Sequence, residues 1–533
     1  MISTSNISLQ YGKRVLFEKV SITFNPGNCY GLIGANGSGK SSFLKILSKE
    51  IESTSGDVLI PSGKRLSVLK QDHFQYDEIL VLDVVIMGHI ELFKVMQAKN
   101  EIYAKENFSD ADGIKASELE SEFERMDGWN AESDAAQLLS NLGIAESLQS
   151  LPMKELTGAL KVRVLLAQAI FGEPDILLLD EPTNNLDIKT IMWLENFLYD
   201  FKNTVIVVSH DRHFLDQVCT HIADIDYSKI QLFVGNHSFW YQSSNLAQQQ
   251  LRDGNKKADE KRKELQAFIA RFSANASKSR QATSRKKMLE KIVLTDIKPT
   301  TRKYPAIQFR QGKEAGNNII EIKKLAKSID TKPIFTNLGF RIENGEKVAF
   351  VSESDISIST LFRILVDELQ SDEGEFKWGA STNRSYYPKD NTKYFQSKHN
   401  LNDWLRQFSP NGEEGFIRGQ LGRMLFSGEE TLKKSCVLSG GEKVRCMLAR
   451  MMLNDANVLI FDEPTSHLDL EAIESLNESM LKFPGTILFT SKDHALIQSI
   501  ATRIIEITPT GVIDNQHMTY DEYLEKTSLT NVK

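Results

Sequence analysis

The amino-acid sequence predicts an α/β protein in which one fold occurs twice, with a helical linker between the two copies. Three observations support this prediction. A glycine-rich motif stands between a strand-like and a helix-like run near the N-terminus, an eight-residue motif recurs in the second half of the chain, and a basic stretch with helical periodicity separates the two copies. Two well-matched halves of this kind indicate a tandem duplication.

The glycine-rich motif occupies residues 34–41 and fits the phosphate-binding pattern G-x-x-x-x-G-K-[ST]. A strand-like run over residues 29–33 precedes it and a helical run over residues 43–47 follows it. In this setting backbone N–H groups converge on phosphates at the positive end of a helix. We expect Lys40 to reach the β- and γ-phosphates and Ser41 to bind Mg²⁺; the alternative is a glycine-rich turn with an exposed lysine. The expected ATP contacts here are Gly34, Asn36, Gly37, Gly39, Lys40, Ser41 and Ser42.

The composition is that of a globular protein. Hydrophobic residues make up 41% and charged residues 25% of 533 positions, a length that suggests three or four domains. There is no apolar run near 18 residues and no charged-then-apolar start, so we expect neither a membrane span nor a signal peptide. The cysteines form no C-x-x-C pair and indicate reduced thiols in a cytoplasmic protein; they are Cys29, Cys219, Cys436 and Cys446.

The recurring motif marks the duplication. It reads Asp-Glu-Pro-Thr-Asn-Asn-Leu-Asp over residues 180–187 and Asp-Glu-Pro-Thr-Ser-His-Leu-Asp over residues 462–469, an offset of 282. Residues 156–161 match residues 438–443 at the same offset. Matches at a constant spacing show that the two copies share more than one motif.

The phosphate-binding motif gives a different offset. It matches residues 352–359 at a spacing of 318, so the first copy holds 36 additional residues between its two motifs. We expect a first domain over residues 1–240 and a second over residues 316–533.

The additional residues predict a helical arm over about residues 88–128 of the first domain. Residues 89–104 contain no proline or glycine, and residues 109–113 have the composition of a turn. Three apolar side chains then recur at helical spacing; they are Leu119, Phe123 and Met126.

Residues 241–315 form a basic linker. From Leu251 to Pro305 there are 16 Lys or Arg and 6 Asp or Glu, in a chain whose net charge is −7. This segment predicts two antiparallel helices, with the small, polar and basic residues 273–284 at the tip. The apolar seams of the two helices are Leu265, Ile269 and Phe272, and Met288, Leu289, Ile292 and Val293.

A positive segment in an acidic protein is the electrostatic footprint of a polyanion partner, and a solvated linker is the alternative. The tip has few aromatic residues, which favours contacts with phosphates over stacking on unpaired bases. We expect five side chains to contact nucleic acid: Lys278, Arg280, Arg285, Lys286 and Lys287.

Two further strand-like runs end in residues suited to phosphate chemistry. Asp180 is placed to bind Mg²⁺ beside the phosphate loop, and Glu181 to orient or deprotonate an attacking water. His210 follows another apolar run, where an imidazole can donate to the γ-phosphate, although a single histidine is more often structural. Tyr11 is a candidate for stacking on adenine, or else a core or surface tyrosine.

The order of these motifs resembles that of the ATP-binding cassettes of the ABC superfamily. The phosphate loop, Gln71, Leu-Ser-Gly-Gly at residues 438–441, Asp-Glu-Pro-Thr and Ser-His-Asp all occur in family order. Two cassettes with an arm, a basic linker and no membrane domain resemble the ABC-F proteins over essentially the whole chain. Residues 268–278 and 30–37 are similar to the bacterial YbiT group.

The resemblance implies two tandem ABC-type ATPase domains in a cytosolic enzyme that hydrolyses ATP with Mg²⁺. It implies binding to the ribosome at the tRNA exit site, with the linker reaching the peptidyl-site tRNA and rRNA and the arm touching the stalk of the large subunit. It also implies that each nucleotide lies between one cassette's phosphate loop and the other's signature. The resemblance further implies that Gln71 is a catalytic residue of the first site and binds Mg²⁺ together with Ser41 and Asp180. It also adds to this site the signature residues Ser439, Gly440, Gly441 and Glu442.

The chain departs from the family pattern in one of the two composite sites. The second loop lacks its glycines and its lysine, the expected glutamine and histidine are both lysines, and the first signature is altered. Such losses remove charge-assisted bonds to phosphate. We expect one hydrolytic site and one degenerate site that binds ATP weakly or not at all, in a monomeric chain. The altered positions are Ser357, Ile358, Lys389, Lys492, Thr157 and Ala159.

Two alternatives remain open. One is the nucleotide-binding subunit of an ABC transporter, which requires a membrane partner and leaves the linker and arm without a role. The other is a ribosome-binding protein with negligible turnover, against which Glu181 and His210 argue. Tandem ATPases with metal or iron–sulfur modules are disfavoured because the chain has no cysteine cluster.

Overall fold

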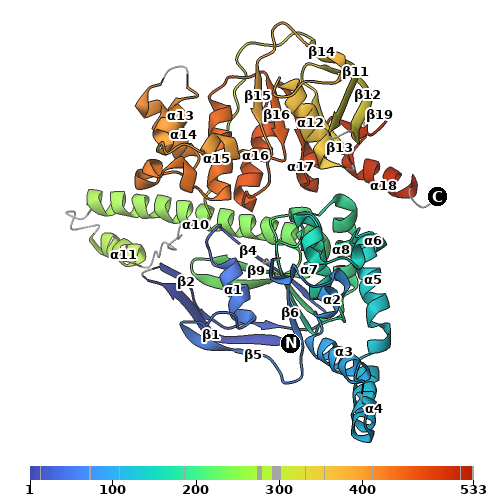
Figure 1. Ribbon diagram of the computed structural model, residues 1–533. Helices are drawn as coiled ribbons and strands as arrows, with labels where there is room; N and C mark the ends of the chain where they lie inside the picture. The colour runs from blue at the N-terminus through green and yellow to red at the C-terminus, as the bar shows by residue number, and fades with distance from the viewer. Residues whose placement is uncertain are drawn as a thin grey trace.

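The computed structural model describes residues 1–12, 14–70, 74–106, 108–184, 186–272, 279–290, 302–329, 332–352, 354–409, 412–516 and 518–530. Figure 1 shows an N-terminal half (residues 1–236) below a C-terminal half (residues 302–530), with helix α10 crossing between them. Each half combines a mostly parallel sheet with helices, so the predicted α/β class is confirmed.

The N-terminal half contains two sheets. A six-stranded sheet has the order β10-β9-β4-β8-β7-β6, and an antiparallel sheet pairs β1 with β2, β3 and β5. The central strands β4, β7 and β8 are almost wholly buried, because parallel strands are covered on both faces. The strands are β1 Ile2–Tyr11, β2 Arg14–Val20, β3 Thr23–Phe24, β4 Cys29–Gly34, β5 Ser55–Leu59, β6 Leu66–Val68, β7 Ile176–Asp180, β8 Thr204–Val208, β9 His221–Asp226 and β10 Lys229–Val234.

The C-terminal half repeats this arrangement. Its large sheet has the order β19-β18-β13-β17-β16-β15, and its small sheet the order β12-β11-β14. Each strand of the large sheet therefore has a counterpart at the same place in the N-terminal half, as a duplication predicts. The strands are β11 Asn318–Ile329, β12 Lys332–Glu343, β13 Lys347–Ser352, β14 Glu373–Trp378, β15 Arg384–Tyr387, β16 Val458–Asp462, β17 Thr486–Thr490, β18 Arg503–Thr508 and β19 Gly511–Gln516.

Helices cover both faces of the large sheets. Helices α1 and α12 lie between the two sheets of their half, and their apolar side chains join a cluster shared with both sheets. The helices of the two halves are α1 Lys40–Leu47, α2 Val81–Ile86, α5 Ala131–Asn141, α6 Glu146–Gln149, α7 Gly158–Ile170, α8 Ile188–Asp200, α9 Arg212–Val218, α12 Asp355–Leu365, α13 Leu401–Arg406, α14 Glu414–Arg423, α15 Gly440–Met452, α16 Leu470–Lys482, α17 His494–Ile500 and α18 Tyr520–Thr530.

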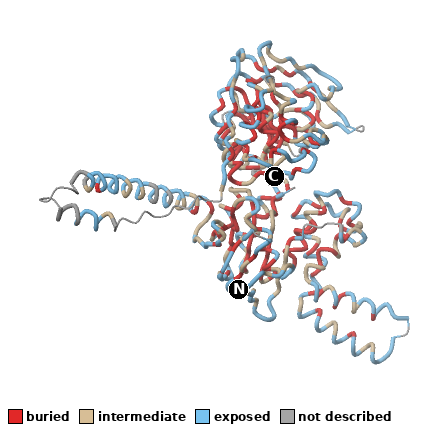
Figure 2. Tube along the Cα trace, turned by 90° about the vertical axis from the view of Figure 1, so that its left-hand side faces the viewer, coloured by how far each residue is buried: buried red, intermediate tan, exposed pale blue. Residues whose placement is uncertain are grey.

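A pair of helices, α3 (Ile90–Tyr103) and α4 (Asp110–Arg125), projects from the N-terminal half, as Figure 2 shows. The Lys99 ammonium lies over the ring of Phe123, 3.9 Å from its centroid, and so ties α3 to α4. The turn predicted over residues 109–113 is wrong in part, because Ser109 caps α4 in a capping box with Asp112. The helix therefore begins at Asp110.

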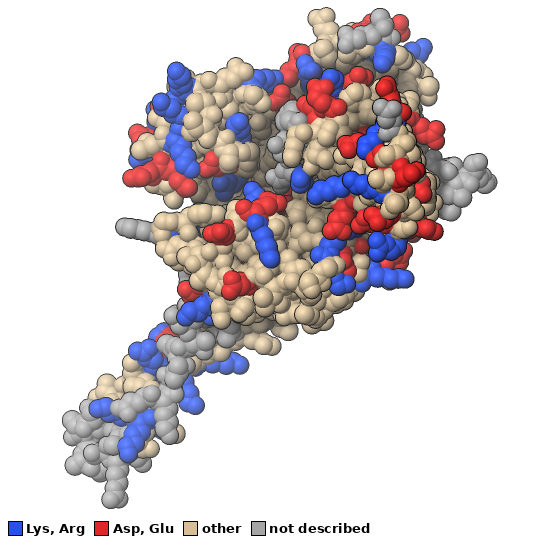
Figure 3. All heavy atoms as spheres, turned by 60° about the horizontal axis from the view of Figure 1, so that its bottom comes forward, with Lys and Arg blue, Asp and Glu red and all other residues tan. Residues whose placement is uncertain are grey.

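The linker consists of α10 (His237–Phe272) and α11 (Ser279–Glu290), which contact each other. The part of the predicted tip from residue 279 onwards lies in α11. Lysine and arginine side chains gather along this projection in Figure 3. Of the predicted nucleic-acid contacts, Arg285, Lys286 and Lys287 are exposed on α11, which also contains Arg280, whereas Lys278 lies outside the described residues.

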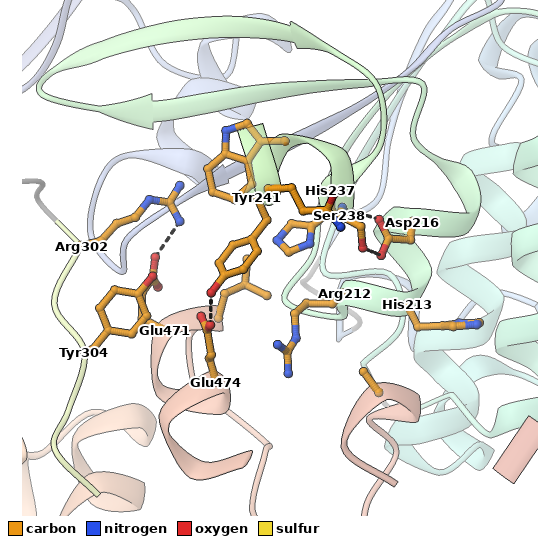
Figure 4. Close-up of a pocket in the computed structure, with 14 residues that line it drawn as sticks. Arg212, His213, Asp216, His237, Ser238, Tyr241, Arg302, Tyr304, Glu471 and Glu474 are labelled. Atoms are coloured by element: carbon orange, nitrogen blue, oxygen red, sulfur yellow. Dashed lines mark hydrogen bonds and ion pairs between the residues drawn. The ribbon is translucent and has the colours of Figure 1, made fainter. Parts of the chain in front are cut away.

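The base of the linker is bonded to both halves (Figure 4). Arg302, at the returning end, donates to Asp224 of β9 at 2.6 Å and to Glu471 of α16 at 2.7 Å. Its side chain is 9% exposed, and those of Asp224 and Glu471 are 13% and 2% exposed. At the other end, the Tyr241 hydroxyl of α10 donates to Glu474 of α16. The placement of the linker is thus tied to the contact between the halves.

Within the described ranges, each helix is too short or too polar to span a lipid bilayer.

Candidate active site

A crevice of about 1000 Å³ lies between the two halves. It brings together residues that the sequence analysis assigned to one composite site from two distant parts of the chain. The phosphate loop comes from the N-terminal half and the signature from the C-terminal half. The predicted residues in its lining are Asn36, Gly37, Gly39, Lys40, Ser41, Ser42, Asp180, Glu181, His210, Ser439, Gly440, Gly441 and Glu442.

The phosphate loop folds around Lys40. The buried ammonium donates to the carbonyl oxygens of Gly34 (2.7 Å) and Ala35 (3.4 Å). Gly39 caps α1 with a φ of 105°, a conformation open mainly to glycine. A Cβ on Gly34 would lie 2.8 Å from the carbonyl oxygen of Ile225, which is too close. The glycines are therefore required by the loop itself, and the loop presents the N-terminus of α1 to an anion.

Arg14 supports the loop from outside, and sequence reasoning missed it. Its guanidinium donates to the carbonyl oxygen of Gly37 at 2.7 Å. Tyr11 is opposite Arg14 in the β1–β2 pairing and is 57% exposed. It does not belong to the lining of the crevice, so its predicted stacking on adenine stays a prediction.

Asp180 and Ser41 meet beneath the loop, and their side chains are hydrogen-bonded. Burial raises the pKa of Asp180, while the Ser41 hydroxyl and the Lys40 ammonium act in the opposite direction. A carboxylate and a hydroxyl oxygen are ligands that Mg²⁺ prefers, so these residues fit that ion. Gln71, the third predicted ligand, lies outside the described residues.

Glu181 and His210 form a polar pair at the ends of β7 and β8. Glu181 has a φ of 52°, and its Oε2 accepts a bond from the His210 N–H at 3.3 Å. Its Oε1 lies 3.5 Å from His210 Nε2. Burial, with Asp180 beside it, raises the pKa of Glu181 to about 8, whereas burial and the Lys40 charge lower the pKa of His210 to about 3. A basic carboxylate next to a neutral imidazole is suited to accept a proton from water.

The C-terminal signature is a helix N-terminus with a complete capping box. The Glu442 N–H donates to Ser439 Oγ at 3.3 Å, and the Ser439 N–H donates to Glu442 Oε2 at 2.9 Å. A Cβ on Gly441 would lie 2.9 Å from the carbonyl oxygen of His467. The signature is therefore packed tightly on the recurring motif of its own half.

The recurring motif of the C-terminal half also reaches this crevice, which sequence reasoning missed. His467 and Asp469 line it, as does Arg445 on α15. Burial lowers the pKa of Lys40, and the negative charges of Glu181, Glu471 and Asp469 oppose that shift. The sequence does contain signals for two of these residues. Asp469 lies in the recurring motif, which the sequence analysis used only as evidence of the duplication. Arg445 is three residues after Glu442 and so lies on the same helix face.

The altered residues of the second site are divided between the core and this same crevice. Ile358 and Ser357 are 3% and 5% exposed, and Ile358 packs in the apolar cluster between the two C-terminal sheets. Neither residue lines the crevice, whereas Lys389, Lys492 and Ala159 do. The residue at the position of the phosphate-binding lysine has thus become part of the core.

The first signature lacks the capping box of the second. Thr157 is the N-cap of α7, but its side chain makes no capping hydrogen bond. Leu160 stands at the position of Glu442, so no carboxylate is available to close the box.

Together these features define a class of protein: a tandem P-loop ATPase with a composite site between its halves. A family model described as ABC transporter matches residues 17–184 and 335–466, and a second model with that description matches residues 223–309. The chain therefore belongs to the ABC family, whose ATPase domains bind ATP and typically use Mg²⁺.

Whole-chain relatives narrow this assignment. The chain is 59% identical to the uncharacterized ABC transporter ATP-binding protein YkpA of Bacillus subtilis (strain 168), over 98% of this chain and 97% of YkpA. It is 46% identical to the probable ATP-binding protein YbiT of Escherichia coli O157:H7, over 98% and 99%. The archaeal ribosome recycling factor aABCE1, solved in complex with the ribosomal stalk protein aP1, shares the fold with a TM-score of 0.60, 16% identity and 98% coverage of both chains. The chain is an ATPase of the ABC-F type, similar to YbiT.

Proposed function

We propose that this ATPase is a translation factor. It binds the ribosome near the tRNA exit site, hydrolyses ATP at one of its two composite sites and contacts the peptidyl-site tRNA through its linker. The observation that carries the proposal is the basic helical hairpin that projects from the junction of two ATPase halves (Figure 2). The relationship to YbiT and the fold shared with a ribosome recycling factor support it.

The linker has the charge that a contact with RNA phosphates requires. Exposed cations continue from α11 along α10, where an ion pair between Lys263 and Asp259 neutralises one of them. Contacts of this kind position a protein on a nucleic acid and weaken as salt rises. The exposed cations of α10 are Lys256, Lys257, Lys261, Arg262 and Lys263.

At the first site, the chain's own residues divide the work of hydrolysis. Lys40 and the loop N–H groups bind phosphate oxygens, Glu181 accepts a proton from the attacking water, and His210 donates a hydrogen bond to the γ-phosphate. Ser41, Asp180 and Gln71 would hold Mg²⁺, which neutralises charge on the phosphates when it is bound. Ser439 and Gly441 close the site from the other half.

At the second site, the same division of work is not available. The lysine position is occupied by a buried isoleucine, and the histidine position by Lys492. Asp462 and Glu463 remain but are 2% and 6% exposed, and two carboxylates without a phosphate loop repel a triphosphate. We infer that one ATP per chain is hydrolysed.

Arg302 provides a route by which ATP at the first site affects the linker. Its partner Glu471 follows Asp469, which reaches the crevice, by two residues, and both carboxylates act on the pKa of Lys40. Because Asp224 and Glu471 lie in different halves, separation of the halves would break one of these two ion pairs of Arg302. The closed form and the placement of the linker are therefore expected to change together.

Ribosome co-sedimentation tests the proposal. The Glu181→Gln variant should pellet with ribosomes in ATP and not in ADP, because it retains ATP and the closed form. Pelleting should weaken with salt, and Lys286→Gln with Lys287→Gln should lower the slope of log K against log salt by about 1.5, or roughly 0.7–0.9 per phosphate contact. A Lys482→Gln variant, at the exposed C-terminal end of α16, is the control. Absence of ATP-dependent pelleting would exclude a ribosome factor.

A further inference from the structure

Lys492 crosses the boundary between the halves on the degenerate side. Its ammonium donates to the carbonyl oxygen of Leu186 in the N-terminal half at 3.2 Å, and its backbone N–H donates to Glu463 Oε2 at 3.2 Å. Leu186 is fully buried. A cation therefore bonds the two halves at the position where the other site has its histidine.

The segment that Lys492 holds begins at Glu181. Within it, the Asn184 N–H donates to the Glu181 carbonyl oxygen and the Leu186 N–H to the Thr183 carbonyl oxygen, each at 3.3 Å. Thr183 and Asn184 line the crevice, and Lys492 lines it too. Two successive turns thus connect Glu181, the candidate general base, to the Leu186 carbonyl oxygen that accepts the hydrogen bond from Lys492.

The corresponding position on the first side differs. His210 is the counterpart of Lys492 by sequence offset, and its Nε2 faces Glu181 within its own half. Its Nδ1 is buried and makes no hydrogen bond to any part of the chain that the structure describes. The shorter imidazole stays in its own site, whereas the longer lysine reaches across the boundary.

We propose that Lys492 is a positioning residue for hydrolysis at the first site. Its ammonium fixes the segment from Glu181 to Leu186 across the boundary, in place of the nucleotide that the degenerate site no longer holds. This inference rests on the single-site function proposed above. Because displacement of a catalytic group by about 1 Å can lower a rate by about 100-fold, loss of this bond acts on turnover more than on ATP binding.

The test compares Lys492→Met with Lys492→Arg in the full chain, with Lys482→Met as a matched control. Lys482 is an exposed lysine paired with Glu478 on the surface of α16. Lys492→Met should lower kcat about tenfold and change KM for ATP less than about twofold. Lys492→Arg should retain most of the activity, because a guanidinium can also donate to the Leu186 carbonyl. Thermal unfolding confirms that each variant is folded.

ATP stoichiometry on Glu181→Gln, measured with and without Lys492→Met, separates the two proposals. The positioning role is supported if Glu181→Gln binds one ATP tightly both with and without Lys492→Met, and if the single variant Lys492→Met shows the expected fall in kcat. The positioning role is overturned if kcat is unchanged in Lys492→Met, or if the methionine and arginine variants lose activity equally. Either result leaves the proposal of a single hydrolytic site intact. Two bound ATP per chain overturn the single-site function and this inference with it.

Discussion

The two composite sites of this protein are built on the same main chain. Glu181 and Glu463 follow equivalent strands with φ of 52° and 53°. Each accepts a hydrogen bond from the backbone N–H 29 residues later, from His210 at 3.3 Å and from Lys492 at 3.2 Å. The backbone geometry of an ATP site is thus retained on the side that has lost its binding groups.

The side chains on this scaffold differ in ways that reinforce one another. Lys40 is held by the loop that a phosphate would enter, whereas Ile358 packs with Phe350 and Phe362 in the core. Burial of an apolar side chain stabilises the C-terminal half without any ligand. The comparison teaches that the sheet and its strand ends belong to the fold, while the two sites differ in the loop and in the residues after the strands.

The largest expected difference between the sites is in turnover. Glu181→Gln should lower kcat at least about 100-fold, because a general base contributes roughly that much. Glu463→Gln, the matched change on the other side, should stay within about threefold of wild type. Phosphate release under saturating ATP measures both, and equal losses in the two variants would show that both sites hydrolyse.

The next difference is in ATP affinity. Lys40→Met should raise the Kd for ATP about tenfold or more, because hydrogen bonds from a charged group contribute about 1.5–3 kcal/mol each. Ile358→Met conserves volume in an apolar cluster and should leave the Kd unchanged. Isothermal titration of each full-length variant gives the comparison. Weaker binding in Ile358→Met would mean that the second loop also contacts nucleotide.

The pH dependence of ATP hydrolysis should arise from the first site alone. The pKa of Glu181 is raised to about 8, so the carboxylate that accepts a proton is present above that pH and is lost as the pH falls. We expect kcat/KM to fall by up to about tenfold per pH unit below 8, since this ratio reports groups of the free enzyme. In Glu181→Gln the residual activity should not show this slope. A persistent slope in that variant would point to a different titrating group.

The smallest difference concerns two equivalent arginines. Arg163 on α7 is paired with Asp187 at 2.7 Å, whereas Arg445 on α15 lines the crevice, and its guanidinium lies over the ring of Phe426. Arg445→Met should raise KM about fivefold, for loss of roughly 1 kcal/mol of interaction. Arg163→Met should change thermal stability instead. Steady-state kinetics with a melting curve distinguishes the two outcomes.

Sequence patterns predicted the fold class, the duplication and the family because each depends on local or repeated features. The apolar run before Asp180 and the glycine-rich loop are periodic and motif-based signals. The grouping of Lys40 with Ser439 in one crevice came from the family resemblance, since nothing in a single cassette specifies the face that meets the other.

Contacts between segments that are distant in the sequence could not be predicted from it, for the same reason. Arg14 supports the phosphate loop and Arg302 bridges the halves through side chains that lie in no motif. The reach of Lys492 to Leu186 depends on how the halves approach each other, not on sequence spacing. At residue 109 the sequence held the right signal, a serine followed three residues later by an acid, but composition suggested a turn instead of a helix cap.

Helix α10 is long enough to turn a small rotation at its base into a large displacement at its far end. Its 36 residues span about 54 Å at 1.5 Å per residue. A rotation of about 10° at its base would sweep its far end through about 9 Å, nearly the diameter of a helix. Near the base of α10, Tyr241 is bonded to the C-terminal half, and Arg302, which lies over the ring of Trp240, is bonded to both halves. A small rotation at this base would therefore produce a displacement of nearly a helix diameter at the far end of α10.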